Sequence, residues 1–279
     1  MSVTPYPGYD ITVENPSVLA SNDGIVWQVP PGLTNPVTNG TGELADPDLF
    51  YDAASDQLWL YYIRKVFPSV SVYLVRRVSS DGMNWSNPEN VVNMPYNALI
   101  SPAVAKIGNT YYLWYVNASP DGSSASSSTV EYRTSQDGKN WSEAGVCQIN
   151  QPGYVIWHID VLPVHVKKPD SREFEEREWM LAASFPVGKS SGYTRLFFAD
   201  SGDTVNWTTY SQPVLSVGDG WDAGQIYRST LLYDPVGDLI RVWYSARSAG
   251  PGSLTLYRWY TGYTQQNYAS LHAWLLLSH

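Results

Sequence analysis

Four short stretches of this 279-residue sequence share one pattern: SNDGIVW (21–27), SSDGMNW (79–85), SQDGKNW (135–141) and SGDTVNW (201–207). They recur about every 60 residues, and a fixed period of this size is typical of repeat architectures. The aspartate of each copy can accept backbone N–H groups within a tight turn, and the glycine that follows it in three copies supplies a positive φ. The pattern therefore predicts one structural turn per repeat, with its tryptophan packed between neighbouring units.

Pairs of apolar runs accompany these turns. They are ADPDLFYDAASDQLWLYYI (45–63), SPAVAKIGNTYYLWYV (101–116), WHIDVLPV with EWMLAASF (157–185) and YRSTLLYDPVGDLIRVWYSA (227–246). Each pair predicts a strand, a tight turn and a second, aromatic strand, and runs such as VYLVRRVSS predict a third strand that leads into the turn. The charged stretch VKKPDSREFEERE (166–178) interrupts the third copy as a solvated loop or a lengthened hairpin.

Repeats of three or four antiparallel strands, arranged radially, make a β-propeller. Inner strands are expected to begin near residues 46, 101, 157 and 226, which gives four clear blades. The copy near the N-terminus holds only the outer part of a repeat. We therefore predict an all-β, five-bladed propeller of four-stranded blades, with the last blade closed by the N-terminal segment and SLHAWLLLSH (270–279). A helix at 270–279 and a four-bladed ring are the alternatives. No linker divides the chain, so residues 1–279 are expected to form a single domain.

The composition excludes several classes of function. Charged residues make up 15% of the chain and the net charge is −9, so nothing favours nucleic acid or an anionic membrane as a partner. The single cysteine, Cys147, forms no internal disulfide and is expected to be a small buried apolar side chain. The stretch MSVTPYPGYD (1–10) does not resemble a signal peptide, which favours a cytoplasmic or virion-associated protein.

Polar residues stand where the inner strands are expected to begin. Alignment of the second strands matches Asp46 with Ser101, approximately with His158, and with Arg228. Asp48 and Asp160 lie two residues further along their strands than Asp46 and His158. Side chains alternate along a strand, so both sets face the same side, with Asp48 and Asp160 one layer deeper. Buried carboxylates without partners are costly, so this ring predicts either a site for a polar ligand or a closed network of ion pairs.

Aromatic residues flank the same strand starts. Trp157, Trp221 and Tyr227 could stack on the C–H faces of sugar rings, and Asp222 follows Trp221 in the loop GDGWD (218–222). An oligo- or polysaccharide is the predicted ligand. No metal or other cofactor is predicted. The aspartates and His158 could hold a central cation such as Ca²⁺, but their spacing matches no metal-binding motif.

The turn motifs resemble the S-x-D-x-x-x-W turns of the five-bladed glycoside hydrolases of families 43, 32 and 68, and similar propellers occur in phage tail-associated proteins. The stretch ADPDLFYD (45–52) resembles the segment from which family 43 enzymes draw a catalytic carboxylate. The resemblance implies that Asp46 is a general base and Asp160 an auxiliary aspartate. The glutamate acid of that family would stand near Gln225, Tyr227 and Arg228, where this chain has none. The candidates for the acid are His158, Asp48, Glu43 and Asp222.

The leading hypothesis is an enzyme, a glycoside hydrolase that cleaves a glycan through carboxylates in a central funnel. Its predicted catalytic residues are Asp46, Asp48, Asp160 and His158, and its predicted substrate contacts are Ser101, Trp157, Trp221, Asp222, Tyr227 and Arg228. One alternative is a non-catalytic propeller that binds carbohydrate, such as a recognition module of a phage tail or a cell surface. Another is a structural propeller in which Arg228 and the aspartates are paired.

Overall fold

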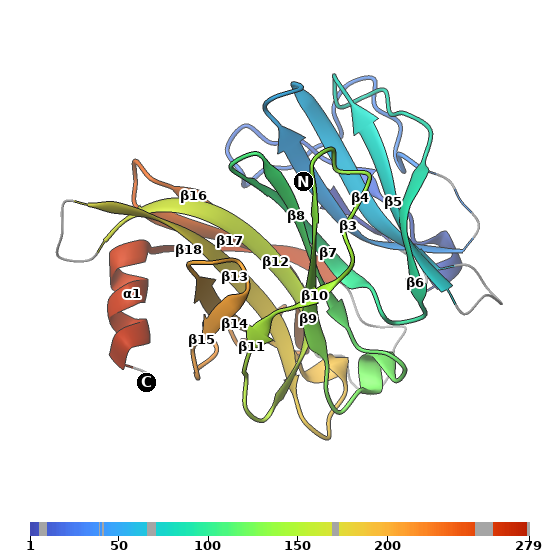
Figure 1. Cartoon of the computed structure of the whole chain (residues 1–279). Coiled ribbons are helices and arrows are strands. Elements are labelled where there is room, and N and C mark those ends of the chain that lie inside the picture. Colours follow the sequence, from blue (N-terminus) through green and yellow to red (C-terminus); the bar gives the residue numbers. More distant parts are fainter. Residues whose placement is uncertain are drawn as a thin grey trace. The chain divides into compact units, whose positions relative to one another are not determined.

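The regular structure is almost all β-strand, as the apolar runs predicted (Figure 1). The computed structural model describes residues 1–5, 10–38, 40, 42–65, 71–168, 173–248 and 259–277. The chain divides into two compact units, one of residues 1–120 and 133–144 and the other of residues 121–132 and 145–279. The expectation of a single domain over residues 1–279 stays a prediction.

The first unit contains the first blade-like sheet. Its strands β3 (Glu43–Asp52), β4 (Gln57–Lys65), β5 (Ser71–Ser79) and β6 (Glu89–Pro95) pair antiparallel in sequence order. The second sheet has the order β10-β9-β8-β7. It consists of β7 (Ile100–Ile107), β8 (Thr110–Asn117), β9 (Thr129–Ser135) and β10 (Gly145–Val146). The division between the two units falls within β9.

The second unit contains two more sheets. One has the order β11-β15-β14-β13-β12, with β11 (Gln148–Ile149), β12 (Tyr154–Lys167), β13 (Phe174–Pro186), β14 (Arg195–Ser201) and β15 (Asn206–Thr209). The other has the order β16-β17-β18, with β16 (Gln225–Asp234), β17 (Leu239–Arg247) and β18 (Trp259–Asn267). Short 3₁₀ turns lie at Ile11–Val13, Gly122–Ser124 and Ser191–Tyr193.

The charged excursion of the third repeat is a lengthened hairpin, one of the two expected outcomes. The pairing of β12 with β13 continues to Lys167 and Phe174, and Lys168 and Glu173 form an ion pair of 3.0 Å at its end. Residues 169–172 of the excursion lie outside the described residues.

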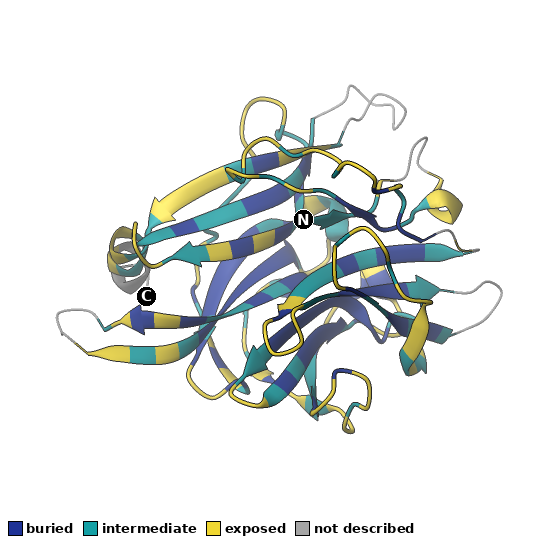
Figure 2. Ribbon diagram, turned by 90° about the horizontal axis from the view of Figure 1, so that it is seen from above, coloured by how far each residue is buried: buried dark blue, intermediate teal, exposed yellow. Residues whose placement is uncertain are grey.

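Each unit has its own apolar core, which lies along the middle of the strands (Figure 2). In the first unit Tyr61, Leu74 and Leu113 are fully buried. In the second unit Trp179 and Phe198 are buried in the core. Cys147 is also buried, and burial raises the pKa of its thiol to about 12, which confirms the prediction of an unreactive apolar side chain.

The repeated turn is built as its sequence predicted. In the second copy Oδ1 of Asp81 accepts the backbone N–H groups of Met83 and Asn84 at 2.8 and 2.7 Å, and Ser79 binds the same carboxylate. The carboxylates of Asp23, Asp137 and Asp203 accept bonds in the same way. The left-handed position has φ of 75°, 72° and 68° at Gly24, Gly82 and Gly138, and 70° at Thr204.

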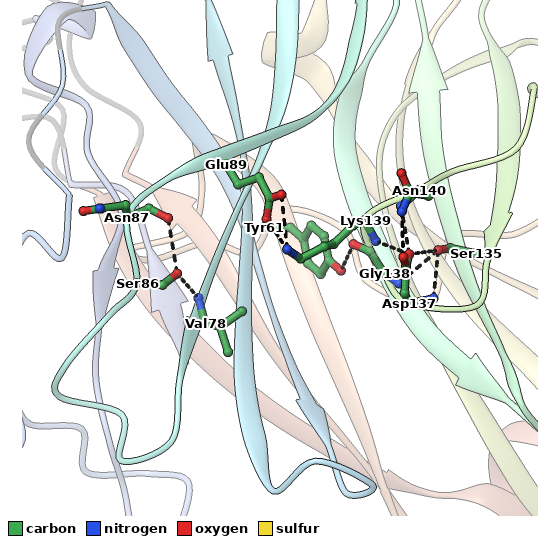
Figure 3. A network of polar contacts seen from close by, with 10 residues as sticks. All are labelled: Tyr61, Val78, Ser86, Asn87, Glu89, Ser135, Asp137, Gly138, Lys139 and Asn140. Atoms are coloured by element: carbon green, nitrogen blue, oxygen red, sulfur yellow. Dashed lines mark hydrogen bonds and ion pairs between the residues drawn. The ribbon is translucent and has the colours of Figure 1, made fainter.

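The turn around Asp137 binds the first sheet (Figure 3). Tyr61 Oη donates a hydrogen bond of 2.8 Å to the carbonyl of Gly138, and Lys139 forms an ion pair with Glu89 at 2.9 Å. A Cβ atom at Gly138 would overlap the ring of Trp59. The ring centre of Trp141 lies 6.3 Å from that of Tyr61. This turn therefore locks one sheet to the next, and its tryptophan lies between them as predicted.

The prediction of five blades is wrong for the described part of the chain, where the structure has four blade-like sheets, as in the alternative. The N-terminal segment forms a separate two-stranded sheet of β1 (Ser2–Val3) and β2 (Ser17–Val18). Its apolar residues Val18, Leu33 and Val37 pack in one cluster with residues of the first sheet. The segment buries these side chains against an existing blade instead of starting another.

The predicted terminal strand at 270–279 is also wrong, and the helical alternative is correct. Residues Tyr268–Leu277 form helix α1. Asp238 anchors its first turn, since its carbonyl accepts the N–H of Tyr268 at 2.9 Å and its carboxylate that of Ala269 at 3.3 Å. The ring centre of Tyr268 lies 4.7 Å from that of Trp179, so the helix is held by aromatic packing. No described helix is long and apolar enough to cross a membrane.

Candidate active site

A β-bulge interrupts the inner strand of every sheet near its start. The register shifts between Ala45 and Asp48, between Ile100 and Ala103, between Ile156 and His158, and between Ile226 and Ser229. Bulges re-aim side chains and are common beside active sites. The sequence placed its predicted ring at these four points.

The bulges correct the predicted alignment in the second unit by one residue. In the first unit Asp46 and Ser101 are equivalent, as predicted, and both have a left-handed backbone with φ of 51° and 53°. In β16 the equivalent residue is Tyr227, and Arg228 follows it. In β12 the bulged residue is Trp157, and His158 resumes the pairing. The shift arose because the sequence shows no sign of a bulge.

The two aspartates of the first unit join neighbouring inner strands. Asp46 Oδ2 accepts the backbone N–H of Ser101 at 2.9 Å, and Asp48 Oδ2 accepts that of Val104 at 2.7 Å. Strand β3 thus holds β7 through two carboxylates. The structure brings Asp46, Asp48 and Ser101 together, and the two carboxylates have the structural role of joining β3 to β7.

A further carboxyl group belongs to this cluster. The backbone N–H of Leu44 donates to the carbonyl of Glu14 at 3.1 Å, which fixes the N-terminal segment beside β3. Burial, together with the charges of Asp46 and Glu43, raises the pKa of Glu14 to about 8 against the lowering effects of Thr4 and Lys65. Glu14 is therefore mostly protonated at neutral pH. A protonated carboxyl group beside a second carboxylate can act as a general acid, and the carboxylate as a general base.

Glu43 is the cluster's ion-paired member. Its carboxylate lies 2.6 Å from Lys65 Nζ, and both side chains are largely buried. Burial alone would lower the pKa of Lys65, but the charges of Glu43 and Asp46 outweigh it and raise that pKa. Because Glu43 is held by a buried cation, it suits the predicted role of acid less well than Glu14 does.

Asp160 acts in the second unit as Asp48 does in the first. Its Oδ2 accepts hydrogen bonds from Thr230 Oγ1 at 2.8 Å and from the N–H of Leu231 at 3.1 Å, which joins β12 to β16. Burial raises the pKa of Asp160, although these bonds and the charge of Arg228 oppose the shift. The structure thus places Asp160 and Arg228 within electrostatic reach of each other.

Aromatic side chains gather at the bulges of β12 and β16. Trp157 Nε1 donates a hydrogen bond of 2.9 Å to Tyr227 Oη. The ring of His158 meets that of Tyr227 edge-on, with 4.5 Å between ring centres, and His158 is buried. Tyr227 also lies 5.5 Å from Trp259 between ring centres. The predicted residues Trp157, His158 and Tyr227 therefore form one cluster in the second unit.

The remaining predicted residues, Trp221 and Asp222, lie in the loop before β16. Trp221 stacks on Tyr244 and is 40% exposed. The convergence of the first-unit and second-unit residues on one axis stays a prediction. No group of three or more potential metal ligands was found among the described residues.

Glu14 is not among the residues that the sequence predicts for the site. The glutamate stands in ENPSVLA (14–20), outside the predicted inner strands, and no motif surrounds it. Only the path of the N-terminal segment beside β3 brings it to Asp46.

Comparison with known proteins gives one curated relative. The chain is 30% identical over 285 residues to the A type blood N-acetyl-alpha-D-galactosamine deacetylase of Flavonifractor plautii, a match that covers 84% of this chain. The chain spans 36% of that relative's length. No family model matches the sequence.

Solved structures show the fold. A crystal structure of an N-acetylgalactosamine deacetylase from F. plautii, in complex with blood group B trisaccharide, matches with a TM-score of 0.85 and 25% identity, over 98% of this chain and 86% of that one. An endo-1,4-beta-xylanase from Bacteroides thetaiotaomicron matches with a TM-score of 0.60 and 14% identity, over 92% and 84%. A thermostable family-43 glycoside hydrolase matches with 0.57 and 14%, over 80% and 72%. The chain thus has an all-β propeller fold.

Proposed function

We propose that this chain is a carbohydrate-active hydrolase that removes the N-acetyl group from a 2-acetamido sugar. The observation that carries the proposal is the pairing of Glu14, whose pKa is raised to about 8, with the neighbouring charge of Asp46. An acid that keeps its proton beside an ionised base suits hydrolysis near neutral pH. The similarity to the F. plautii deacetylase supports an amide as the bond that is broken.

Each of the two carboxyl groups has a defined step. Asp46 takes a proton from water while the water oxygen attacks the acetyl carbonyl carbon. Glu14 gives its proton to the amide nitrogen as the C–N bond breaks, so that acetic acid and the amino sugar leave. The proton on Asp46 then returns to Glu14 through solvent. The N–H of Ser101 orients Asp46 for this step, because it binds one carboxylate oxygen at 2.9 Å.

Hydrolysis of a glycosidic bond is the second candidate. It is favoured by the same pair of carboxyl groups, since glycosidases also need one protonated and one ionised carboxyl. In that reaction Glu14 would protonate the glycosidic oxygen and Asp46 would activate water. The two candidates differ in the bond that breaks and share the residues.

One probe separates the candidates. With p-nitrophenyl N-acetyl-α-D-galactosaminide, deacetylation releases acetate, which NMR detects, and glycoside hydrolysis releases coloured p-nitrophenol. We expect acetate, and we expect Glu14→Gln and Asp46→Asn each to lower its release by roughly 10²- to 10⁴-fold. The exposed Glu143 supplies a matched control, Glu143→Gln, which should be as active as the wild type. Release of p-nitrophenol alone would move the assignment to the second candidate, and no release of either would leave a binding protein.

A further inference from the structure

The loop GDGWD (218–222) presents an aromatic surface to solvent. Trp221 is 40% exposed and Tyr260 is 43% exposed, although large aromatic side chains are usually buried. Their ring centres lie 5.8 Å apart and the rings meet at 70°. The two rings are neighbours, so they form one exposed aromatic surface and not two scattered side chains.

The surface is fixed in place from below. Trp221 stacks on the buried Tyr244, with ring centres 5.7 Å apart and an angle of 23° between the rings. A Cβ atom at Gly262 would lie 2.5 Å from both Trp221 and Tyr244, so only glycine lets the indole lie flat there. Tyr244 stacks on the indole, and 40% of Trp221 stays exposed to solvent.

The loop itself is also held. The N–H of Ala223 donates to the carbonyl of Gly220 at 3.2 Å, and that of Gly224 donates to the carbonyl of Arg247 at 2.9 Å. Asp222 Oδ2 accepts a hydrogen bond of 3.3 Å from Tyr244 Oη. The carboxylate therefore stands beside the aromatic surface in a defined place, and a ligand would meet it without first ordering the loop.

We propose that Trp221, Tyr260 and Asp222 form a binding platform for a pyranose ring of a neutral glycan. The C–H groups on one face of a pyranose carry partial positive charge and suit the negative face of an indole. Asp222 can accept hydrogen bonds from the sugar's hydroxyl groups. The adjacent Asp219 and Asp222 disfavour anionic polymers. The proposal takes from the proposed function only that the ligand is a carbohydrate.

Affinity electrophoresis tests the platform without any turnover. Wild-type protein is run in native gels that contain galactan, xylan or mannan, which are neutral polymers of pyranose sugars. We expect retardation in at least one gel. Trp221→Ala should weaken that binding at least about 2- to 10-fold, and Trp221→Phe should keep most of the affinity. Gly262→Ala should weaken the binding as well. Its Cβ atom would displace the indole of Trp221, although the tryptophan itself is still present.

A matched control uses Tyr193, which is 58% exposed elsewhere in the second unit. Tyr193→Ala should bind as the wild type does, and thermal melts should show that Trp221→Ala is folded. The proposal is overturned if the wild type migrates unchanged in all three gels, if Trp221→Ala is retarded as strongly as the wild type, or if Tyr193→Ala loses as much of the retardation. Acetate release by Trp221→Ala, measured separately, shows whether the proposed function stands when the platform does not.

Discussion

Glu14 is held beside β3 by its own backbone, and its side chain lies within electrostatic reach of Glu43, Asp46 and Lys65. The cluster thus contains one cation, Lys65, and three carboxyl groups. Lys65 pairs with Glu43 at 2.6 Å, and Asp46 accepts the N–H of Ser101. Glu14 is left as the group that keeps its proton. At the scale of single residues, the ion pair between Lys65 and Glu43 therefore decides that Glu14 is the carboxyl group with the raised pKa.

The raised pKa of Glu14 predicts how stability depends on pH. Between its ordinary value of 4.5 and about 8, the unfolded chain has lost this proton and the folded chain keeps it. The free energy of unfolding should therefore fall as pH rises through this window and level off above it. Glu14→Gln should lack this part of the fall. Urea denaturation at about pH 5 and about pH 9 measures the difference, with Glu143→Gln as control. If the free energy of unfolding falls equally between about pH 5 and about pH 9 in the wild type and in Glu14→Gln, the assigned pKa is contradicted.

At the scale of elements, carboxylates tie inner strands together in both units. Asp48 binds the N–H of Val104 in the first unit, and Asp160 binds that of Leu231 in the second. A repeated contact of this kind indicates a structural role that the sequence analysis did not separate from catalysis.

Asp48→Ala should destabilise the protein by roughly 1–3 kcal/mol, because the N–H of Val104 loses its acceptor in a partly buried place. Asp48→Asn keeps an acceptor oxygen and should cost less. Chemical denaturation measures both, with the exposed Asp121→Ala as control. If Asp48→Ala is as stable as the control, the contact between the strands contributes little.

The repeated turns give a second test at this scale. Gly138 and Gly108 both have left-handed backbones, with φ of 68° and 58°, but only at Gly138 would a Cβ atom strike a neighbour, the ring of Trp59. Gly108→Ala should cost about 1–2 kcal/mol for its backbone alone. Gly138→Ala should cost roughly 1–3 kcal/mol more, because the ring must move. Thermal melts of the two variants decide it, and equal losses would mean that the turn does not lock the sheets.

At the scale of the whole molecule, the repeat predicted the strands well and the ends of the chain poorly. The turns around Asp81 and Asp137 carry their whole geometry in seven residues, so the sequence reveals them. Whether the N-terminal segment starts a blade or covers one depends on where Val18 and Val37 find a partner. That is a property of the assembled core and leaves no local pattern. The same holds for Glu14, which tertiary packing alone brings to Asp46.

The central claim is that Glu14 supplies the proton and Asp46 the base in one reaction. The dependence of kcat/KM on pH, measured by acetate release, tests it most directly. The account predicts a bell-shaped profile whose alkaline limb falls near pH 8, where Glu14 loses its proton. In Glu14→Gln the residual activity should lack that limb, while Glu143→Gln keeps it. An alkaline limb near pH 8 that persists in Glu14→Gln would contradict the account.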